Sequence, residues 1–181
     1  LKDKPKNLTV EGYIFPDTYE IADGESCQDV AQIMLANFGK KLTPQLLAEI
    51  AKQKKSIFDV VTMASMIEKE VRTLEDKKIV SGILWRRIAI GMPLQIDATV
   101  NYITGKSDPG VAIKDTKIDS PYNTYKYYGL PKGPISNPGI NSITAALYPT
   151  ATDYLYYLSD GKTYYSKTFE EHQAAKRLYL D

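Results

Sequence analysis

The stretch MASMIEKEVRT (residues 63–73) carries two carboxylates, Glu68 and Glu70, at the end of an apolar pattern with helical spacing. Upstream, Ser56 and Asp59 have the capping-box spacing that starts a helix. At about 100° per residue, the apolar side chains gather on one face. That face contains Val60, Ala64, Ile67, Val71 and Leu74. The pattern therefore predicts a packed helix with both glutamates at opposite borders of its buried face.

A glutamate at such a border has two interpretations. The more common one is a solvated charge on the flank of the helix. The other is an acid held in a cleft for proton chemistry, which requires polar and aromatic loops above the helix. The helix pattern alone favours the solvated charge.

Composition indicates one soluble globular domain, which we expect to span residues 1–181. The chain is 43% hydrophobic and 25% charged, with a formal net charge of +1. This charge balance argues against nucleic acid as a partner. No apolar run approaches the roughly 20 residues of a membrane-spanning helix, and no signal peptide opens the chain. Because the chain begins with a charged segment that lacks Met, we expect a fragment whose membrane anchor lies upstream.

Cysteine and histidine each occur once, as Cys27 and His172. A lone cysteine forms no intramolecular disulfide. One Cys and one His far apart in sequence make a zinc site improbable. The sequence therefore predicts no metal and no cofactor.

Capping and turn residues divide most of the chain into elements. We expect helices over 26–39, 44–53, 56–74, 76–91, 141–148 and 169–180, and a hairpin over 154–166 with a tight, two-residue primed turn at Asp160-Gly161. Residues 8–21 read as an extended segment broken by Pro16. Helices and a separate hairpin without βαβ alternation indicate an α+β fold with a short antiparallel sheet.

The tract from 92 to 138 is rich in Pro, Gly, Asn and Tyr and has little periodicity. Long ordered loops usually carry function. The chain also contains 14 Tyr against 4 Phe and 1 Trp. A tyrosine offers an apolar face with a polar rim, which suits sugar rings, although half-buried strands also favour it. We expect this tract to form a groove above the helix that carries the two glutamates.

Five ordered motifs resemble the endolytic murein transglycosylases, the MltG or YceG-like family. They are EGYIFPDTYEI (11–21), ASMIEKE (64–70), GMPLQIDATVNY (91–102), SPYNTYKYYGLPKGPISNPGINSITAALYP (120–149) and YLYYLSDGKTYYS (154–166). The resemblance extends over nearly the whole chain. It implies an enzyme that cleaves the MurNAc–GlcNAc bond of nascent peptidoglycan strands, leaves 1,6-anhydro-MurNAc ends and so limits strand elongation.

The resemblance also implies a place in the cell. Family members carry a single membrane anchor and a LysM-like region before this domain and act on the outer face of the bacterial cytoplasmic membrane. Glycan strands are the implied partner, and cell-wall synthesis enzymes are further possible partners. Relatives often have a His in the second strand of the terminal hairpin, where this chain has Tyr164 and Tyr165.

Carried over by position, the catalytic acid is Glu68. Glu70 lies in the same motif, where a supporting role as a hydrogen-bonding or helix-flank residue and a direct role both stay open. One glutamate can protonate the glycosidic oxygen and later take the proton of the 6-hydroxyl, because the nucleophile belongs to the substrate. Such an acid needs a raised pKa, which apolar neighbours produce by desolvation. We expect Val61, Ala64 and Ile67 to be those neighbours of Glu68.

Further candidates for substrate contacts come from the family motifs. They are Gln95, Asp97, Asn123, Tyr125, Asn137, Glu11 and Tyr19. Asp97 could be a second catalytic carboxylate or a helix cap, and Asn137, Glu11 and Tyr19 could instead shape the loops. Two other functions stay open: a non-catalytic glycan-binding or scaffold domain, and a hydrolytic lysozyme-like muramidase.

Overall fold

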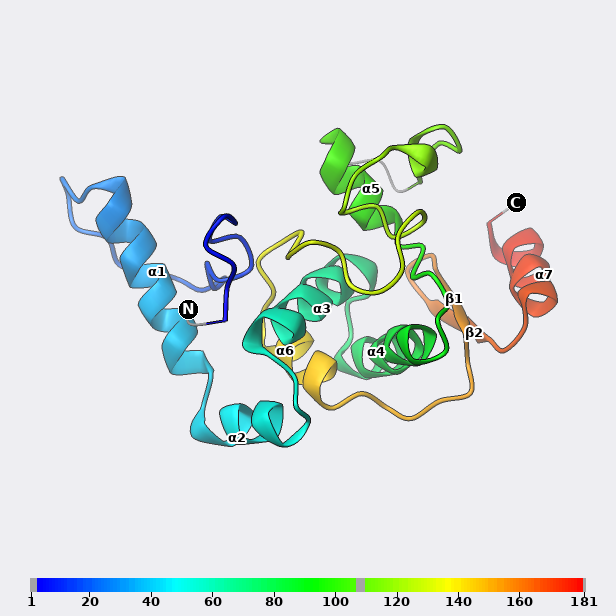
Figure 1. Ribbon diagram of the computed structural model, residues 1–181, viewed down its shortest axis with the longest axis horizontal. Coiled ribbons are helices and arrows are strands. Elements are labelled where there is room, and N and C mark those ends of the chain that lie inside the picture. The colour runs from blue at the N-terminus through cyan, green and yellow to red at the C-terminus, as the bar shows by residue number, and fades with distance from the viewer. Residues whose placement is uncertain (1–2, 107–109, 181) are drawn as a thin grey trace.

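The computed structural model describes residues 3–106 and 110–180. This part of the chain contains seven α-helices, one 3-10 helix and one two-stranded antiparallel sheet, which confirms the α+β prediction (Figure 1). The elements are α1 (Cys27–Lys41), α2 (Pro44–Lys52), α3 (Ile57–Glu70), α4 (Leu74–Ala89), α5 (Asp97–Thr104), η1 (Asp115–Lys117), α6 (Ile140–Leu147), β1 (Tyr156–Ser159), β2 (Thr163–Ser166) and α7 (Phe169–Tyr179).

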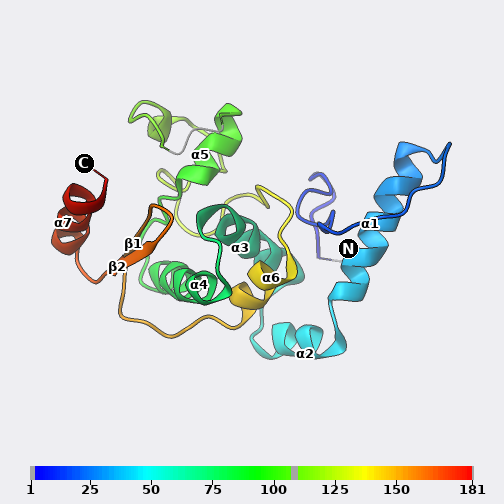
Figure 2. The ribbon, with the colours of Figure 1, turned by 180° about the vertical axis from the view of Figure 1, so that it is seen from behind.

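Helix α3 forms the centre of the core. All residues from Val60 to Ile67 are buried, so this helix is covered on every side. Its neighbours α4 and α6 pack against it, as the view from behind also shows (Figure 2). The predicted cap is confirmed, since the Ser56 hydroxyl accepts from the Asp59 N–H at 2.9 Å. The core therefore fixes α3 and the position of the glutamates at its C-terminal end.

The segment between α6 and β1 crosses α4 at close range. A Cβ on Gly82 would lie 2.0 Å from the carbonyl oxygen of Thr150, so only glycine fits there. The Thr150 N–H donates to the Lys78 carbonyl at 3.0 Å. This crossing leads the chain from the core to the hairpin.

The hairpin has the predicted place but a longer turn than predicted. Ser159 pairs with Thr163, so the loop contains three residues, with Gly161 at φ +79°. The expected two-residue turn is therefore wrong. Lys162 belongs to the loop because its carbonyl accepts from the Asp160 N–H at 3.1 Å. Helix α7 follows and packs on both strands.

Several predicted element boundaries differ from the structure. Helix α1 continues through Gly39 to Lys41, and α6 begins after Gly139 rather than at an Asn141 cap. Residues 8–21 form no strand. Val71 is extended, so it and Leu74 lie outside α3. The tract 92–138 contains α5 and η1, which its weak periodicity did not predict. The helix-cap alternative for Asp97 did imply a helix start here, although Asp97 is the first residue of α5 and Ile96 is its N-cap.

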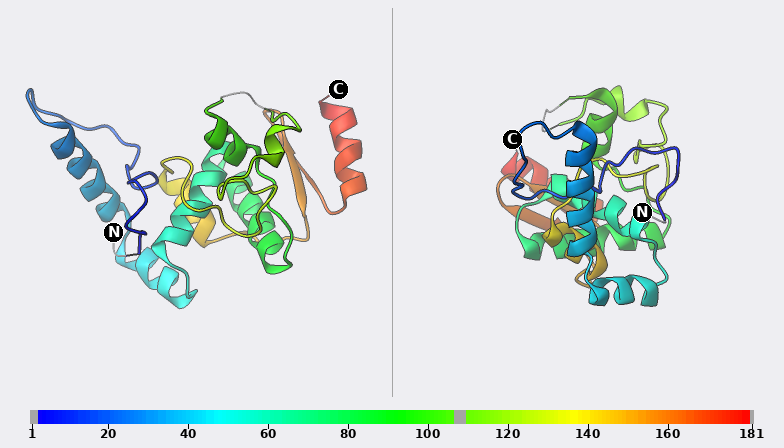
Figure 3. Two further views of the ribbon diagram at one scale, coloured as in Figure 1. Left: turned by 45° about the horizontal axis from the view of Figure 1, so that its top comes forward. Right: turned by 90° about the vertical axis from the view of Figure 1, so that its left-hand side faces the viewer.

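The molecule is elongated. Helices α1 and α7 lie at opposite ends, with α3, α4 and α6 between them (Figures 1 and 3). No helix in the described ranges is long and apolar enough to span a membrane.

Candidate active site

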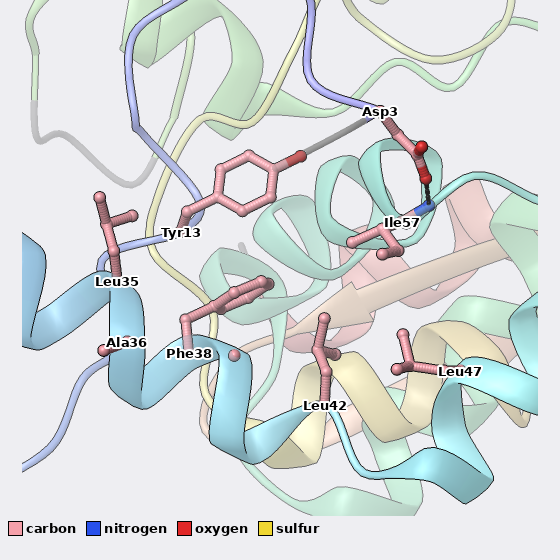
Figure 4. A pocket seen from close by; sticks show the side chains of 9 residues that line it. Asp3, Tyr13, Leu35, Ala36, Phe38, Leu42, Leu47 and Ile57 are labelled. Atoms are coloured by element: carbon pink, nitrogen blue, oxygen red, sulfur yellow. Dashed lines mark hydrogen bonds between the residues drawn. The ribbon is translucent and has the colours of Figure 1, made fainter.

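Two cavities differ sharply in chemistry. The smaller, about 510 Å³, lies among α1, α2, α3 and the N-terminal segment and is lined mainly by apolar side chains such as Leu35, Phe38 and Leu42 (Figure 4). Tyr13 lies there, and burial, together with the charges of Asp3 and Asp59, raises its pKa to about 12. The larger cavity is an open groove of about 1480 Å³ that contains several carboxylates and tyrosines. The groove is the candidate active site, because it alone combines polar groups with room for a glycan chain.

Elements far apart in sequence form this groove. Its floor is the C-terminal end of α3, and its walls come from α4, α5, the hairpin and α7. In Figure 1, α5 lies at the top and α7 at the right, with the hairpin between them. The groove residues with ionisable or aromatic side chains include Glu68, Glu70, Asp76, Arg87, Asp97, Tyr102, Tyr125, Tyr156, Tyr157 and His172.

Glu70 has the electrostatics of a general acid. Burial raises its pKa to about 7, although the Tyr157 hydroxyl lowers it and the charge of Asp97 raises it. The Tyr157 hydroxyl donates to Oε2 of Glu70 at 2.7 Å. Near neutral pH this carboxyl is therefore divided between its protonated and ionised forms, as proton donation and return both require.

Asp97 and Tyr125 form a pair beside Glu70. Asp97 is the first residue of α5, and the Tyr125 hydroxyl donates to its Oδ1 in a short hydrogen bond. Burial raises the pKa of Tyr125 far above its usual value, and the bond to Asp97 raises it further. Gln95 also lines the groove, with an unusual φ of +51°. Asp97 and Tyr125 therefore lie beside Glu70, and Gln95 lines the same groove.

Glu68 has a different environment from the expected one. Its Oε2 accepts from the Ser142 hydroxyl at 2.5 Å, from the Gly139 N–H at 3.1 Å and from the Lys77 ammonium at 3.1 Å. Burial alone would raise its pKa, but these three donors outweigh burial and lower it. The expectation of a raised pKa at Glu68 is therefore wrong.

The partners of Glu68 explain what it does in the fold. Gly139 is the N-cap of α6 and provides no side-chain cap, so Glu68 supplies the anion at that helix start. The side chain of Lys77 is only 7% exposed and has Glu68 as its ion-pair partner. Glu68 thus joins α3, α4 and α6 as an ionised group.

Four predicted substrate-binding residues lie outside the groove lining. Asn123 is fully buried, and its amide donates to the carbonyls of Thr116 and Ile118. Asn137 accepts from the N–H groups of residues 12 and 14 at 2.8 and 3.2 Å. Both side chains hold loops together, because backbone groups pair with the Asn123 NH2 group and with the Asn137 side-chain oxygen.

The other two are Tyr19 and Glu11. The Tyr19 hydroxyl donates to the Phe15 carbonyl at 2.5 Å and contacts Asn37 on α1. Glu11 lies close to the groove rim, where its charge adds to burial in raising the pKa of Tyr102. Tyr19 belongs to the α1 region, and only Glu11 is near the site.

The sequence did not single out two groove residues, Tyr157, which bonds to Glu70, and the buried cation Arg87. Tyr157 was one of several hairpin tyrosines with nothing to distinguish it. Arg87 is buried on α4, where Nε donates to the Leu155 carbonyl and Nη1 to the Leu94 carbonyl, both at 2.7 Å. A charged residue on the buried side of an amphipathic helix was the available signal for Arg87.

The chain is similar to known proteins over most of its length. Residues 2–178 match the YceG-like family. The chain belongs to the YceG-like family. An endolytic murein transglycosylase of Bacillus subtilis (strain 168) is 42% identical over 174 residues, which are 94% of this chain and 48% of the relative. One from Streptococcus pneumoniae serotype 2 is 34% identical over 180 residues, which are 95% of this chain and 32% of the relative.

A crystal structure of a YceG-like protein from Listeria monocytogenes has the same fold. It superposes with a TM-score of 0.86 at 40% identity and covers 92% of this chain and 55% of that one. The chain therefore spans about half, or less, of the length of these relatives. Among the residues that the structure describes, no group of three or more His, Cys, Asp or Glu side chains could hold a metal ion.

Proposed function

We propose that this domain is an endolytic lytic transglycosylase that cleaves the MurNAc–GlcNAc bond of peptidoglycan and leaves a 1,6-anhydro-MurNAc end. The observation that carries the proposal is Glu70, a carboxyl with a pKa of about 7 on the floor of an open groove. The names of the family relatives support murein as the substrate class.

Glu70, rather than Glu68, is the proposed acid. An acid that must donate a proton near neutral pH needs a raised pKa, which Glu70 has and Glu68 lacks. Oε2 of Glu68 accepts from three donors within the fold, so ionised Glu68 stabilises the domain instead. The resemblance implies Glu68, and the different hydrogen-bond partners of the two carboxyls support Glu70 in its place.

The reaction would need only one carboxyl for proton transfer. Protonated Glu70 donates to the glycosidic oxygen as the bond to the anomeric carbon breaks. The 6-hydroxyl of the same MurNAc then attacks that carbon, and Glu70 takes its proton. Atoms balance without water, since the hydroxyl oxygen closes the anhydro ring.

Asp97 is the proposed source of negative charge for the oxocarbenium-like transition state. It lies close enough to Glu70 to raise its pKa, and Tyr125 holds it in place. Hydrolysis would need a second carboxylate in a comparable position, where it would act as the general base for water or as the nucleophile. The hydrolytic alternative therefore also depends on Asp97.

Product mass decides between these reactions. Intact murein is incubated with the wild-type domain and with Glu70→Gln, and the products are weighed by mass spectrometry. Transglycosylation gives ends that are lighter by one water than hydrolytic ends. Hydrolytic ends would replace the proposal with a muramidase, and intact murein after incubation with the wild-type domain would favour a non-catalytic binding or scaffold domain. Equal anhydro products from both proteins would exclude Glu70 as the acid.

The cellular setting follows from the substrate. Peptidoglycan lies outside the cytoplasmic membrane, so we propose that the domain acts there. An upstream membrane anchor and contacts with cell-wall synthesis enzymes stay predictions.

A further inference from the structure

Helix α7 presents one face to the groove. Phe169, His172, Gln173, Lys176 and Leu180 line it, and their spacing of three and four residues places them on one side of the helix. No described residue of α7 is buried. This face therefore remains accessible from the groove.

Tyr156 joins this face to a buried cation. The ring of His172 stacks on Tyr156 with centroids 5.5 Å apart and an interplanar angle of 22°. The guanidinium carbon of Arg87 lies 5.0 Å from the centroid of the same ring. Lys176 follows His172 by four residues, one helical turn. Arg87 and His172 thus both contact Tyr156. Lys176 lies close enough to His172 for its charge to lower the pKa of His172.

Two of these side chains have unused hydrogen-bonding capacity. Nδ1 of His172 is buried and has no hydrogen-bond partner among the described residues. Arg87 is held by backbone carbonyls through Nε and Nη1, and the described contacts give its Nη2 no acceptor. Arginine supplies donors in a planar fork that matches a carboxylate.

We propose that Arg87, His172 and Lys176 form an anion subsite that binds a carboxylate of the substrate beside the cleaved bond. The inference rests on the proposed function, because murein carries carboxylates on its stem peptides and, where a stem peptide has been removed, on the free lactyl group. A glycan lying along the groove would have its reacting bond at Glu70 and its acidic substituent at α7.

Nearby charges support this assignment. Burial lowers the pKa of His172, and the charges of Lys176 and Arg87 lower it further. The neighbouring carboxylate on α7, Glu171, faces the helix start, where it accepts from the Lys167 and Thr168 N–H groups. Asp160 lies in the hairpin turn. A bound carboxylate would favour the imidazolium and raise the pKa of His172.

The single histidine gives a direct measurement. The imidazole Hε1 resonance of His172 is titrated by NMR in Glu70→Gln, which keeps ligands intact. The ligands are a peptide-bearing murein fragment, a peptide-free fragment with its lactyl carboxylate, and a chito-oligosaccharide without any carboxylate. We expect the carboxylated ligands to raise the pKa of His172 and the chito-oligosaccharide to leave it unchanged or lower it.

The two murein ligands separate the sources of the carboxylate. A rise with the peptide-free fragment alone identifies the lactyl group, and a rise with the peptide-bearing fragment alone identifies the stem peptide. A rise with both fragments shows that the subsite accepts either carboxylate. Bound murein fragments that leave the pKa unchanged, or a chito-oligosaccharide that raises it equally, would overturn the subsite. This readout needs no turnover, so it stays valid if the domain makes no anhydro product.

A matched pair of variants tests the same subsite by affinity. Lys176→Ala should weaken binding of the carboxylated fragment by about tenfold, which is typical of losing a charge-assisted contact. The adjacent Arg177, which does not line the groove, provides the control, and Arg177→Ala should change affinity less than twofold. Both variants should bind the chito-oligosaccharide equally. Equal losses for the two variants with the carboxylated ligand would contradict the proposal.

Discussion

The Tyr157 hydroxyl donates to Oε2 of Glu70 at 2.7 Å and so joins β1 to the end of α3. Two residues earlier, Glu68 accepts from donors on α4 and α6 instead. Both carboxyls line the groove, but one bonds to the hairpin and the other to donors on two core helices. Their pKa values shift in opposite directions because their partners differ.

Glu70→Gln should abolish most cleavage while leaving the fold intact. Loss of a general acid typically costs about 10²- to 10⁴-fold in rate. Burial disfavours ionised Glu70, so its folded pKa lies above its unfolded pKa. Its ionisation therefore destabilises the domain as pH rises through about 7. Glu70→Gln should melt higher than wild type at pH 8 and show a smaller difference at pH 5, as measured by thermal unfolding beside the murein assay.

Glu68→Gln should instead lower stability. The substitution leaves Lys77 nearly buried without its counter-ion, and we expect a loss of about 1–2 kcal/mol in the free energy of unfolding. This figure is below that of a fully buried pair because the Glu68 side chain is 32% exposed. Residual activity per folded molecule should exceed that of Glu70→Gln. Urea titration measures the stability, and exposed Glu75→Gln on α4 is the control.

The pH dependence of that loss has a defined sign. Glu68 has a depressed pKa in the folded state, so it stabilises the domain above its unfolded pKa. The contribution is lost as pH falls through the folded pKa, and the difference between wild type and Glu68→Gln should shrink in acid. If Glu68→Gln stayed stable and lost activity as completely as Glu70→Gln, the roles of the two glutamates would have to be exchanged.

Tyr157→Phe should move the alkaline limb of the pH–rate profile to higher pH. The hydroxyl stabilises ionised Glu70, so its removal raises the pKa of the acid and extends the range in which it is protonated. We expect a displacement of about half to one pH unit in kcat/KM. Tyr165→Phe in the same hairpin removes a hydroxyl that bonds to Asp76 and serves as the control. If the alkaline limb of the profile stayed at the same pH in Tyr157→Phe, the ionisation of Glu70 would not be what limits the rate at high pH.

Local signals predicted most of the helices. Capping boxes at Ser26, Ser56 and Thr168 are all present, because such a box is complete within four residues of sequence. Helix α5 was missed because its N-cap, Ile96, provides no side-chain cap. Its Thr, Val and Ile residues are also weak helix formers. Helix α5 therefore has no local signal at its start and depends on tertiary packing, which the sequence pattern does not report.

The choice between the two glutamates shows the same limit. Periodicity places both at borders of the α3 face, where they are equivalent. Their difference comes from Ser142 and Tyr157, which are 74 and 87 residues away from their partners in sequence. Predicting which carboxyl titrates near 7 therefore required the tertiary structure.

Variants at Asn123 and Tyr125 distinguish a residue that stabilises the loop from a residue that acts in the groove. Asn123→Ala removes an amide that bonds to the carbonyls of Thr116 and Ile118 and accepts from the Tyr125 N–H at 3.0 Å. Because a buried amide network holds this loop, the variant should lose about 1–3 kcal/mol of stability, with activity falling in proportion to the folded fraction. Tyr125→Phe keeps the ring and removes only the hydroxyl that bonds to Asp97.

That second variant should behave in the opposite way. Without the hydroxyl, Asp97 loses a partner in the groove, so cleavage should fall about tenfold while the melting temperature changes little. Thermal unfolding and murein cleavage measured on both variants give the comparison, with Tyr128→Phe, whose side chain is exposed, as the control. A melting drop in Tyr125→Phe that accounts for its whole loss of activity would place Tyr125 with Asn123 in the loop scaffold. Asp97 would then need a different explanation for its place beside Glu70.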